Sequence, residues 1–238
     1  MIYSVKYRIC GQCMSFDIDT WMEEYLEKVK SLFGSRLVFV GLQGSRGRGE
    51  ATEDSDIDAV VILDRVDVQD LKAYSAVLDT LPNREMACGF ISGRQELVNW
   101  EKSDFFQFYH DTTPIYGNIG FLLKTIKKED IHRAIRIGTC NIYHVCGHNM
   151  VHEKDAKMLK SLYKAASFAI QAIHYDQTGT YVKLKSELIP VLGPRDREIL
   201  QTGIMVKTQS SVVQSEFEPL SELLFNWAAE VIIEYKAD

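Results

Sequence analysis

Apolar positions in the first half of the chain follow two patterns, helical spacing and short continuous runs. Trp21, Tyr25 and Val29 recur at every fourth position, which predicts an amphipathic helix over residues 17–33. Apolar runs at 37–42 and 57–63 have the length and the β-branched content of buried strands. Weaker patterns predict the elements that follow: a helix at 67–81, a strand at 85–91, helical turns at 96–110, and a short strand or turn at 114–117.

After position 120 the pattern becomes helical almost to the end of the chain. Helices are predicted at 122–149 with a break near 127, at 153–177, at 195–206 and at 218–236, and residues 202–211 are the most loop-like stretch late in the chain. An α/β segment followed by an all-α segment predicts two domains. We place the boundary between residues 1–119 and a helical bundle at 120–238.

Composition narrows the class of protein. The chain has 238 residues, 46% of them hydrophobic and 25% charged, as in ordinary globular proteins. No apolar run approaches the ~20 residues of a membrane span, and the first ten residues lack a signal-peptide core, so we expect a cytoplasmic protein without a membrane partner. The net charge of −6 argues against general nucleic-acid binding but would attract a cationic substrate. The oligomeric state is left open, a homodimer included.

The cysteines predict no specific chemistry. They number five, and an odd number without an export signal is typical of reduced thiols. Cys10 and Cys13 have the CxxC spacing of a redox pair or of half a zinc site. The remaining zinc ligands would have to come from a single cluster of cysteines and histidines. That cluster comprises Cys140, His144, Cys146 and His148. Cys140, His144 and His148 recur at helical spacing, which favours a polar stripe on one helix face over a zinc site.

The most informative stretch, residues 44–63, reads GSRGRGEATEDSDIDAVVIL. Asp56 and Asp58 stand at the start of a predicted strand, where residues two apart point to the same face. Two carboxylates ~6 Å apart repel by about 3 kcal/mol at an effective dielectric of ~20, so such a pair indicates a bound cation. Mg²⁺ often takes one or two carboxylates plus substrate phosphates. The glycine-rich turn that carries Ser45 offers backbone N–H groups to phosphate oxygens. The combination predicts a site for a metal and a nucleoside triphosphate.

The same stretch resembles the signature of the polymerase-beta-like nucleotidyltransferase superfamily. In that signature a G-S, here Gly44 and Ser45, precedes by about a dozen residues an aspartate, a hydrophobe and a second acid, here Asp56 and Asp58. The longer form is similar to small bacterial members, which include the kanamycin- and streptomycin-type aminoglycoside nucleotidyltransferases. The resemblance implies an α/β (α+β) nucleotidyltransferase domain with a small mixed sheet, Mg²⁺ on the two aspartates, and NTP at Gly44 and Ser45. Gln43 departs from the family, which usually has an apolar or aromatic residue there.

The resemblance also implies a third acid on the strand after the aspartates. Glu85 is the acid at the start of the predicted third strand, and in the aminoglycoside-modifying relatives a glutamate there is the general base on the acceptor hydroxyl. We assign that role to Glu85. The alternatives are that Glu85 is a solvated strand end and that Asp79 or Glu96, both in helical patterns, supplies the acid.

Positive charge for the triphosphate has several candidate sources. Residues 164–188 read KAASFAIQAIHYDQTGTYVKLKSEL and look like the helix–TG–x–Y–…–K segment of the same transferases and of HEPN-like helical domains. In them a lysine beyond the TG turn reaches back to the triphosphate, a role that Lys185 fits best, with Lys183 beside it. Lys164 is a second candidate. Arg46 and Arg48 lie in the glycine turn, and guanidinium pairs well with phosphate.

These features predict a Mg²⁺-dependent nucleotidyltransferase. It would move an NMP, with AMP the leading choice, from an NTP to a hydroxyl of a small molecule such as an aminoglycoside-like antibiotic, and release pyrophosphate. One alternative is an antitoxin-like enzyme that AMPylates a partner protein. Another is a non-catalytic nucleotide-binding regulatory module, against which the intact acid pair argues.

Overall fold

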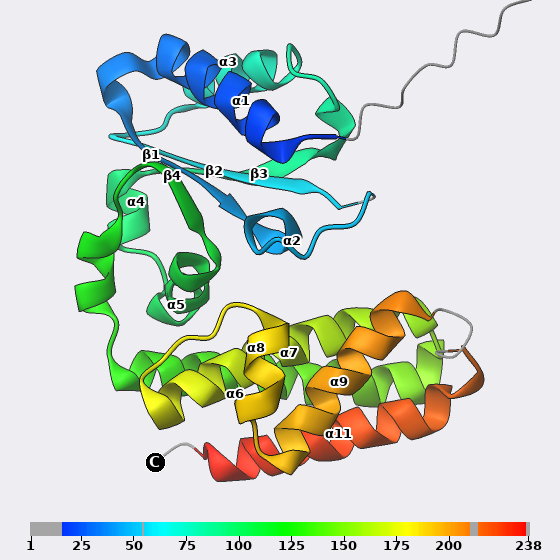
Figure 1. Ribbon diagram of the computed structural model, residues 1–238. Coiled ribbons are helices and arrows are strands. Elements are labelled where there is room, and N and C mark those ends of the chain that lie inside the picture. The colour runs from blue at the N-terminus through cyan, green and yellow to red at the C-terminus, as the bar shows by residue number, and fades with distance from the viewer. Residues whose placement is uncertain (1–15, 54, 210–213, 237–238) are drawn as a thin grey trace, which may run out of the picture.

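The computed structural model describes residues 16–53, 55–209 and 214–236 (Figure 1). Its helices and strands are connected by loops and, in several places, by short 3-10 turns. In chain order the α-helices and β-strands are α1 (Ile18–Phe33), β1 (Leu37–Gln43), α2 (Gly44–Gly47), β2 (Ile57–Leu63), α3 (Val68–Leu78), β3 (Ala87–Gly93), α4 (Arg94–Val98), α5 (Lys102–Asp111), β4 (Thr113–Gly117), α6 (Lys128–His148), α7 (Ala156–Thr178), α8 (Lys185–Leu188), α9 (Pro194–Thr208) and α11 (Phe217–Glu234).

The strands form a small mixed sheet in the order β3-β2-β1-β4. β1 runs antiparallel to β2 and β4, whereas β2 and β3 are parallel. In this register Asp58 lies opposite Gln43 of β1 and beside Cys88 of β3. The aspartates therefore sit at the start of a central strand. The predicted fold class, a small mixed sheet followed by helices, is confirmed.

The two faces of the sheet pack against different elements, and this fixes the direction of the aspartates. Alternate residues of β2 from Ile57 to Leu63 join the core beneath α1 and α3. Val60 and Ile62 belong to the opposite face, where they pack with Leu97 of α4 and with α5. Asp58 is in phase with Val60 and Ile62, because side chains alternate along a strand. Its carboxylate thus projects from the face that looks toward the helical half in Figure 1.

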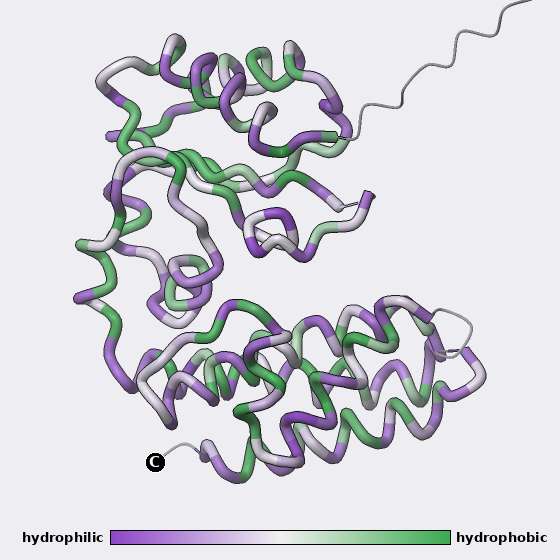
Figure 2. Tube along the Cα trace, in the orientation of Figure 1, coloured by the Kyte–Doolittle hydropathy of each residue, from purple (hydrophilic) through white to green (hydrophobic). Residues whose placement is uncertain are grey.

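The helical half has its own core, built from α6, α7, α9 and α11. Figure 2 shows apolar and polar residues alternating around these helices, the pattern expected when one stripe of each helix is buried. Phe106 of α5 belongs to this core as well, so the sheet half and the helical half share packed side chains. Among the described residues no helix is long and apolar enough to cross a membrane.

Two predicted elements differ from the observed ones. The third strand begins at Ala87, and Glu85 lies before it in a 3-10 turn (Arg84–Met86) that follows the left-handed Asn83. The helix predicted at 195–206 is α9, which begins with Pro194 at a position that suits proline and continues to Thr208. Residues 202–208 are therefore helical rather than loop-like.

Candidate active site

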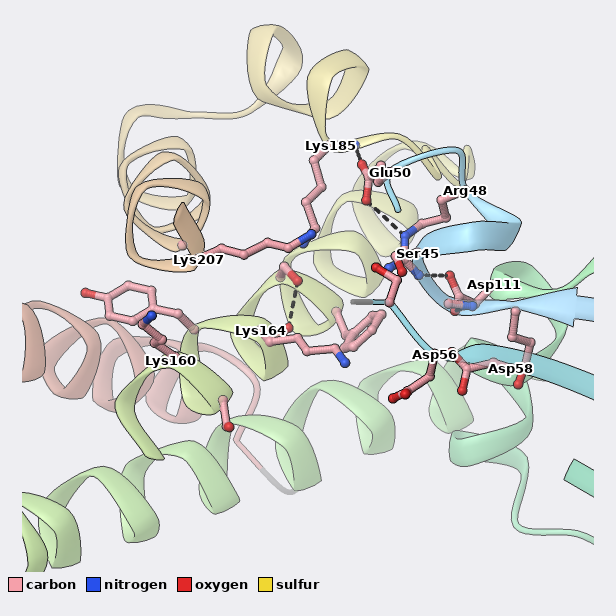
Figure 3. Close-up of a pocket in the computed structure, with 18 of the residues that line it drawn as sticks. Ser45, Arg48, Glu50, Asp56, Asp58, Asp111, Lys160, Lys164, Lys185 and Lys207 are labelled. Atoms are coloured by element: carbon pink, nitrogen blue, oxygen red, sulfur yellow. Dashed lines mark hydrogen bonds and ion pairs between the residues drawn. The ribbon is translucent and has the colours of Figure 1, made fainter. Parts of the chain in front are cut away.

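A cleft of about 510 Å³ separates the start of β2 from the helices α7, α8 and α9. This volume lies within the ~300–1,000 Å³ typical of small-molecule sites. Figure 3 shows its lining, with carboxylates on the sheet side and lysines on the helical side.

The glycine-rich segment from Gly44 to Glu50, called the glycine turn below, closes one end of the cleft. β1 ends at Gln43, whose Nε2 donates to the carbonyl of Phe108 (3.1 Å) and to Oγ1 of Thr112 (2.8 Å) and so ties the turn to the end of α5. Gly44 follows with a φ of 68°, a conformation that favours glycine. Gly44 and Ser45 both line the cleft. The turn therefore presents backbone and hydroxyl groups to the cavity.

Asp56 and Asp58 form the acidic edge of the cleft, as the sequence predicts. Asp58 is half-buried, and this burial is the main reason why its pKa is raised, with the charge of Asp56 raising it further. Lys164, across the cleft, acts in the opposite direction. The carboxylate pair thus carries a repulsion that a cation between the two groups would relieve.

Asp111 is a third carboxylate of the cleft, and no sequence pattern points to it. It ends α5, is only 8% exposed, and accepts hydrogen bonds from the N–H of Gly44 (3.2 Å) and from Nη1 of Arg48 (2.5 Å). Arg48 also donates from Nε to Glu50 (3.1 Å). An acid at the end of a helix belongs to no spacing motif, so only the packing of α5 beside the turn reveals its place.

Glu85 lies outside the lining of this cleft. It is exposed in the 3-10 turn before β3, while Cys88 occupies the strand position beside Asp58. Arg46 is also outside the lining, since its guanidinium donates to the carbonyl of Ser55 (3.0 and 2.7 Å). Two of the site residues predicted from the sequence, Arg46 and Glu85, therefore do not line the cleft. The others do: Gly44, Ser45, Arg48, Asp56, Asp58, Lys164 and Lys185.

Lysines of the helical half form the wall opposite the carboxylates. Lys160 and Lys164 stand one turn apart on α7 and both line the cleft. Two like charges at that spacing repel each other and destabilise a helix slightly. An anionic ligand in the cleft would offset this repulsion, so the position of the two lysines favours such a ligand. Lys185, the first residue of α8, is half-buried, and burial lowers its pKa.

Lys207 of α9 adds a further positive charge to that wall. It extends toward Lys185 in Figure 3, and its charge acts on that lysine. Leu200, Gly203 and Lys207 share the face of α9 that meets the cleft. The sequence pattern did not reveal Lys207, because it predicts a loop at this position.

The carboxylates suit a hard divalent cation. Among the described residues no group of three or more His, Cys, Asp and Glu side chains has the arrangement of a protein-only metal site. Mg²⁺ commonly binds one or two carboxylates and completes its shell with phosphates and water, so Asp56 and Asp58 suffice for it. Two observations support this fit: both carboxylates line the same cleft, and the charge of Asp56 acts unfavourably on that of Asp58.

The cysteine and histidine candidates lie elsewhere. Cys10 and Cys13 are outside the described residues. On α6, Cys140 and His144 are exposed, whereas Cys146 is buried and donates from Sγ to the carbonyl of Ser221 (3.4 Å). These side chains take no part in the cleft.

Comparison with known proteins finds a family match in the sheet half. Residues 22–110 match the family model described as "Nucleotidyltransferase domain". The matched segment runs from α1 into α5 and contains the glycine turn with both aspartates. No curated protein matches the chain.

A solved structure resembles the chain over both halves. The crystal structure of spectinomycin adenyltransferase AAD(9) from Enterococcus faecialis, with ATP and spectinomycin, has a TM-score of 0.51 and 14% sequence identity to this chain. The match covers 87% of this chain and 99% of that chain. At this identity the likeness is one of fold. The domain match confirms the predicted resemblance to nucleotidyltransferases, and the fold of the chain over both halves resembles that of this adenyltransferase.

Proposed function

We propose that this nucleotidyltransferase moves AMP from ATP to a hydroxyl of a small-molecule acceptor and releases pyrophosphate. The observation that carries the proposal is the cleft itself, in which Asp56 and Asp58 face Lys164 and Lys185 beside the glycine turn. A triphosphate with its metal is the ligand that needs carboxylates on one side and ammonium groups on the other. The same arrangement supports a division into a nucleotidyltransferase domain at 1–119 and a helical domain at 120–238, with the nucleotide between them.

The chain's own residues would act mainly by position and charge. The turn at Gly44 and Ser45 would hold phosphate oxygens, and Lys164 and Lys185 would neutralise the charge that gathers on the leaving pyrophosphate. The acceptor oxygen would then bond to the α-phosphorus as the bond from that phosphorus to the β-phosphate oxygen breaks. Such transfer depends on holding the reacting atoms in line.

Asp56 and Asp58 would hold Mg²⁺. When bound, the ion supplies charge neutralisation at the phosphates and orients them. The carboxylates themselves fix where that charge sits, because β2 is a central strand with neighbours on both sides.

The acceptor hydroxyl must lose a proton, and two carboxylates compete for this role. Glu85 is the residue that the family resemblance favours, but it stands exposed outside the cleft. Asp111 lines the cleft, and its partner Arg48 is a guanidinium for which a phosphate would compete. The position of Asp111 therefore supports it as the base, with Glu85 as the alternative.

An antibiotic-like acceptor is supported by the structural neighbour, which carries the name spectinomycin adenyltransferase and was solved with ATP and spectinomycin. A protein hydroxyl, as in an AMPylating antitoxin, would use the same nucleotide site. A non-catalytic nucleotide-binding module is disfavoured, because it would have no need for an intact carboxylate pair facing lysines.

One experiment separates these functions. The protein is incubated with each α-labelled NTP, Mg²⁺, a panel of aminoglycosides and related antibiotics, and cell lysate. We expect label from ATP on a small molecule. Label on a protein would support the AMPylating alternative, and nucleotide binding without any labelled product would support the regulatory module. Asp56→Asn serves as the inactive control.

A further inference from the structure

The connection from α7 to α8 is fixed to the helical half before it reaches the cleft. α7 ends at Thr178 and is capped by Gly179, which has a φ of 71° and donates its N–H to the carbonyl of Tyr175 (2.7 Å). The buried Gln171 then donates from Nε2 to the carbonyls of Val182 and Lys183 (3.0 Å each). The backbone at Lys183 is therefore anchored to α7, and its side chain starts from a defined place.

The side chain of Lys183 reaches the sheet half instead of the cleft. Its Nζ donates to Oγ1 of Thr113 at 2.6 Å, and that hydroxyl donates in turn to the carbonyl of Gly47 at 2.7 Å. Thr113 begins β4, and Gly47 ends α2, the short helix at the start of the glycine turn. Two consecutive hydrogen bonds thus connect the helical half to the turn beside the aspartates.

A parallel connection lies two residues further along the chain. The backbone N–H of Lys185 donates to Oε1 of Glu50 (3.2 Å), and Glu50 accepts from Arg48 (3.1 Å). The far end of the turn is therefore held by the same segment of the helical half. The turn also packs closely on β1, because a Cβ on Gly47 would collide with the carbonyl oxygen of Leu42.

We propose that Lys183 is a positioning residue that sets the glycine turn relative to the lysine wall through Thr113. The inference rests on the proposed function, in which both walls hold one nucleotide. It also assigns different roles to two neighbouring lysines: Lys185 lines the cleft and contacts the ligand, whereas Lys183 holds the turn. A half-buried lysine beside a hydroxyl is a costly choice for mere packing, since burial opposes its charge and lowers its pKa.

Amide hydrogen exchange tests whether Lys183 positions the glycine turn, and it requires no acceptor substrate. The amides of Arg48 and Glu50 donate within the turn, to the carbonyls of Gly44 (3.1 Å) and Ser45 (2.8 Å). We expect Lys183→Met to speed their exchange about tenfold, the factor that corresponds to loss of one hydrogen bond to a charged group. Thr113→Val should have the same effect, and Thr113→Ser, which keeps the hydroxyl, should have little. The double variant should be no faster than either single variant, because both break the same connection.

Kinetics supplies the second measurement, using the acceptor found with labelled ATP. Lys183→Met and Thr113→Val should lower kcat more than they raise the KM for ATP, whereas loss of a ligand-binding lysine should raise KM. Lys157→Met, on the exposed start of α7, is the control and should match the wild type. Unchanged exchange in Lys183→Met, or an effect of Lys183→Met that Thr113→Val does not share, would overturn the proposal. If the wild type transfers nothing, the proposed function has failed, and the exchange data still decide whether Lys183 positions the turn.

Discussion

A side-chain carbon on Gly44 would collide with Oδ2 of Asp58. The turn therefore approaches the carboxylate pair as closely as a backbone without a side chain allows. The φ of 68° at Gly44 adds a second reason for glycine, because L-residues rarely adopt that conformation.

The first prediction follows from this contact. Gly44→Ala should displace either the turn or the Asp58 carboxylate, and a displacement of ~1 Å can cost about 10²-fold in rate. Gly49→Ala is a matched control, because Gly49 has a φ of 72° and a Cβ there would meet no atom within 4 Å. Both variants should lose thermal stability to backbone strain, Gly44→Ala at least as much as Gly49→Ala, and only Gly44→Ala should lose kcat/KM. Equal loss of activity in the two variants would show that backbone strain, and not the contact with Asp58, sets the requirement.

The second prediction concerns the charge of Asp58. Its pKa is raised above the ordinary 3.8, chiefly by burial and then by Asp56. Folding therefore favours the protonated form, and the carboxyl's stabilising contribution is lost as the pH rises through the raised pKa. Asp58→Asn should abolish transfer yet raise the Tm at neutral pH without divalent ions, by roughly 2–4 °C for each kcal/mol of repulsion relieved.

The pH dependence checks the cause of that stabilisation. The gain in Tm should shrink toward zero as the pH falls to about 4 or below, where an ordinary aspartate is itself protonated. Thermal unfolding of the two proteins across this range, in chelator, provides the measurement. A gain of constant size at every pH would point to packing rather than charge, and full activity of Asp58→Asn would remove the aspartates from the mechanism.

The third prediction concerns Lys185. Lys185→Ala should raise the KM for ATP roughly tenfold or more, the loss expected for a charge-assisted contact to phosphate, and leave the fold intact. Lys207→Ala should do the same to a smaller extent, because Lys207 is the more exposed of the two. Calorimetric titration with Mg²⁺–ATP gives the affinities, and Lys157→Ala is the control. An unchanged affinity in Lys185→Ala would assign that lysine to the solvated surface.

Much of this site was predictable because its residues are close in sequence. Gly44, Ser45, Asp56 and Asp58 belong to one turn and one strand, so a spacing pattern captures them together. The strand's apolar alternation also gives the face on which the aspartates lie. The same holds for Lys185, which follows a recognisable helix end at Gly179.

The remaining features of the site could not be predicted, because they depend on contacts between segments that are distant in the sequence. Asp111 enters the cleft because α5 packs beside the turn, and Lys207 does so because α9 continues beyond its predicted end. Glu85 is a predicted site residue that the fold places outside the cleft, although its residue type suits the role. Asn83, in a left-handed conformation, precedes a 3-10 turn that contains Glu85, and the strand begins only after this turn. No local pattern separates Lys183 from Lys185 either, because only the contact of Lys183 with Thr113, a residue distant in sequence, shows that Lys185 is the one that lines the cleft.

The fourth prediction decides which carboxylate is the base. A general base contributes typically ~10²–10⁴-fold to rate and little to ground-state binding. Asp111→Asn should therefore lower turnover by at least ~10²-fold while Mg²⁺–ATP affinity changes less than about tenfold, since the amide can still accept from Gly44. Glu85→Gln should stay within about twofold of the wild type on both measures, well below the effect of losing a base. Asp104→Asn, at an exposed position of α5, controls for the isosteric change.

The opposite outcome is equally informative. If Glu85→Gln loses turnover with normal binding and Asp111→Asn does not, the base is Glu85, and the turn before β3 must reach the acceptor once that molecule is bound. If Asp111→Asn loses binding and turnover together, Asp111 supports the glycine turn through Gly44 and Arg48 and does not take the proton. Rates and affinities measured on the same preparations distinguish the two cases, because loss of a base lowers the rate at fixed occupancy of the nucleotide site.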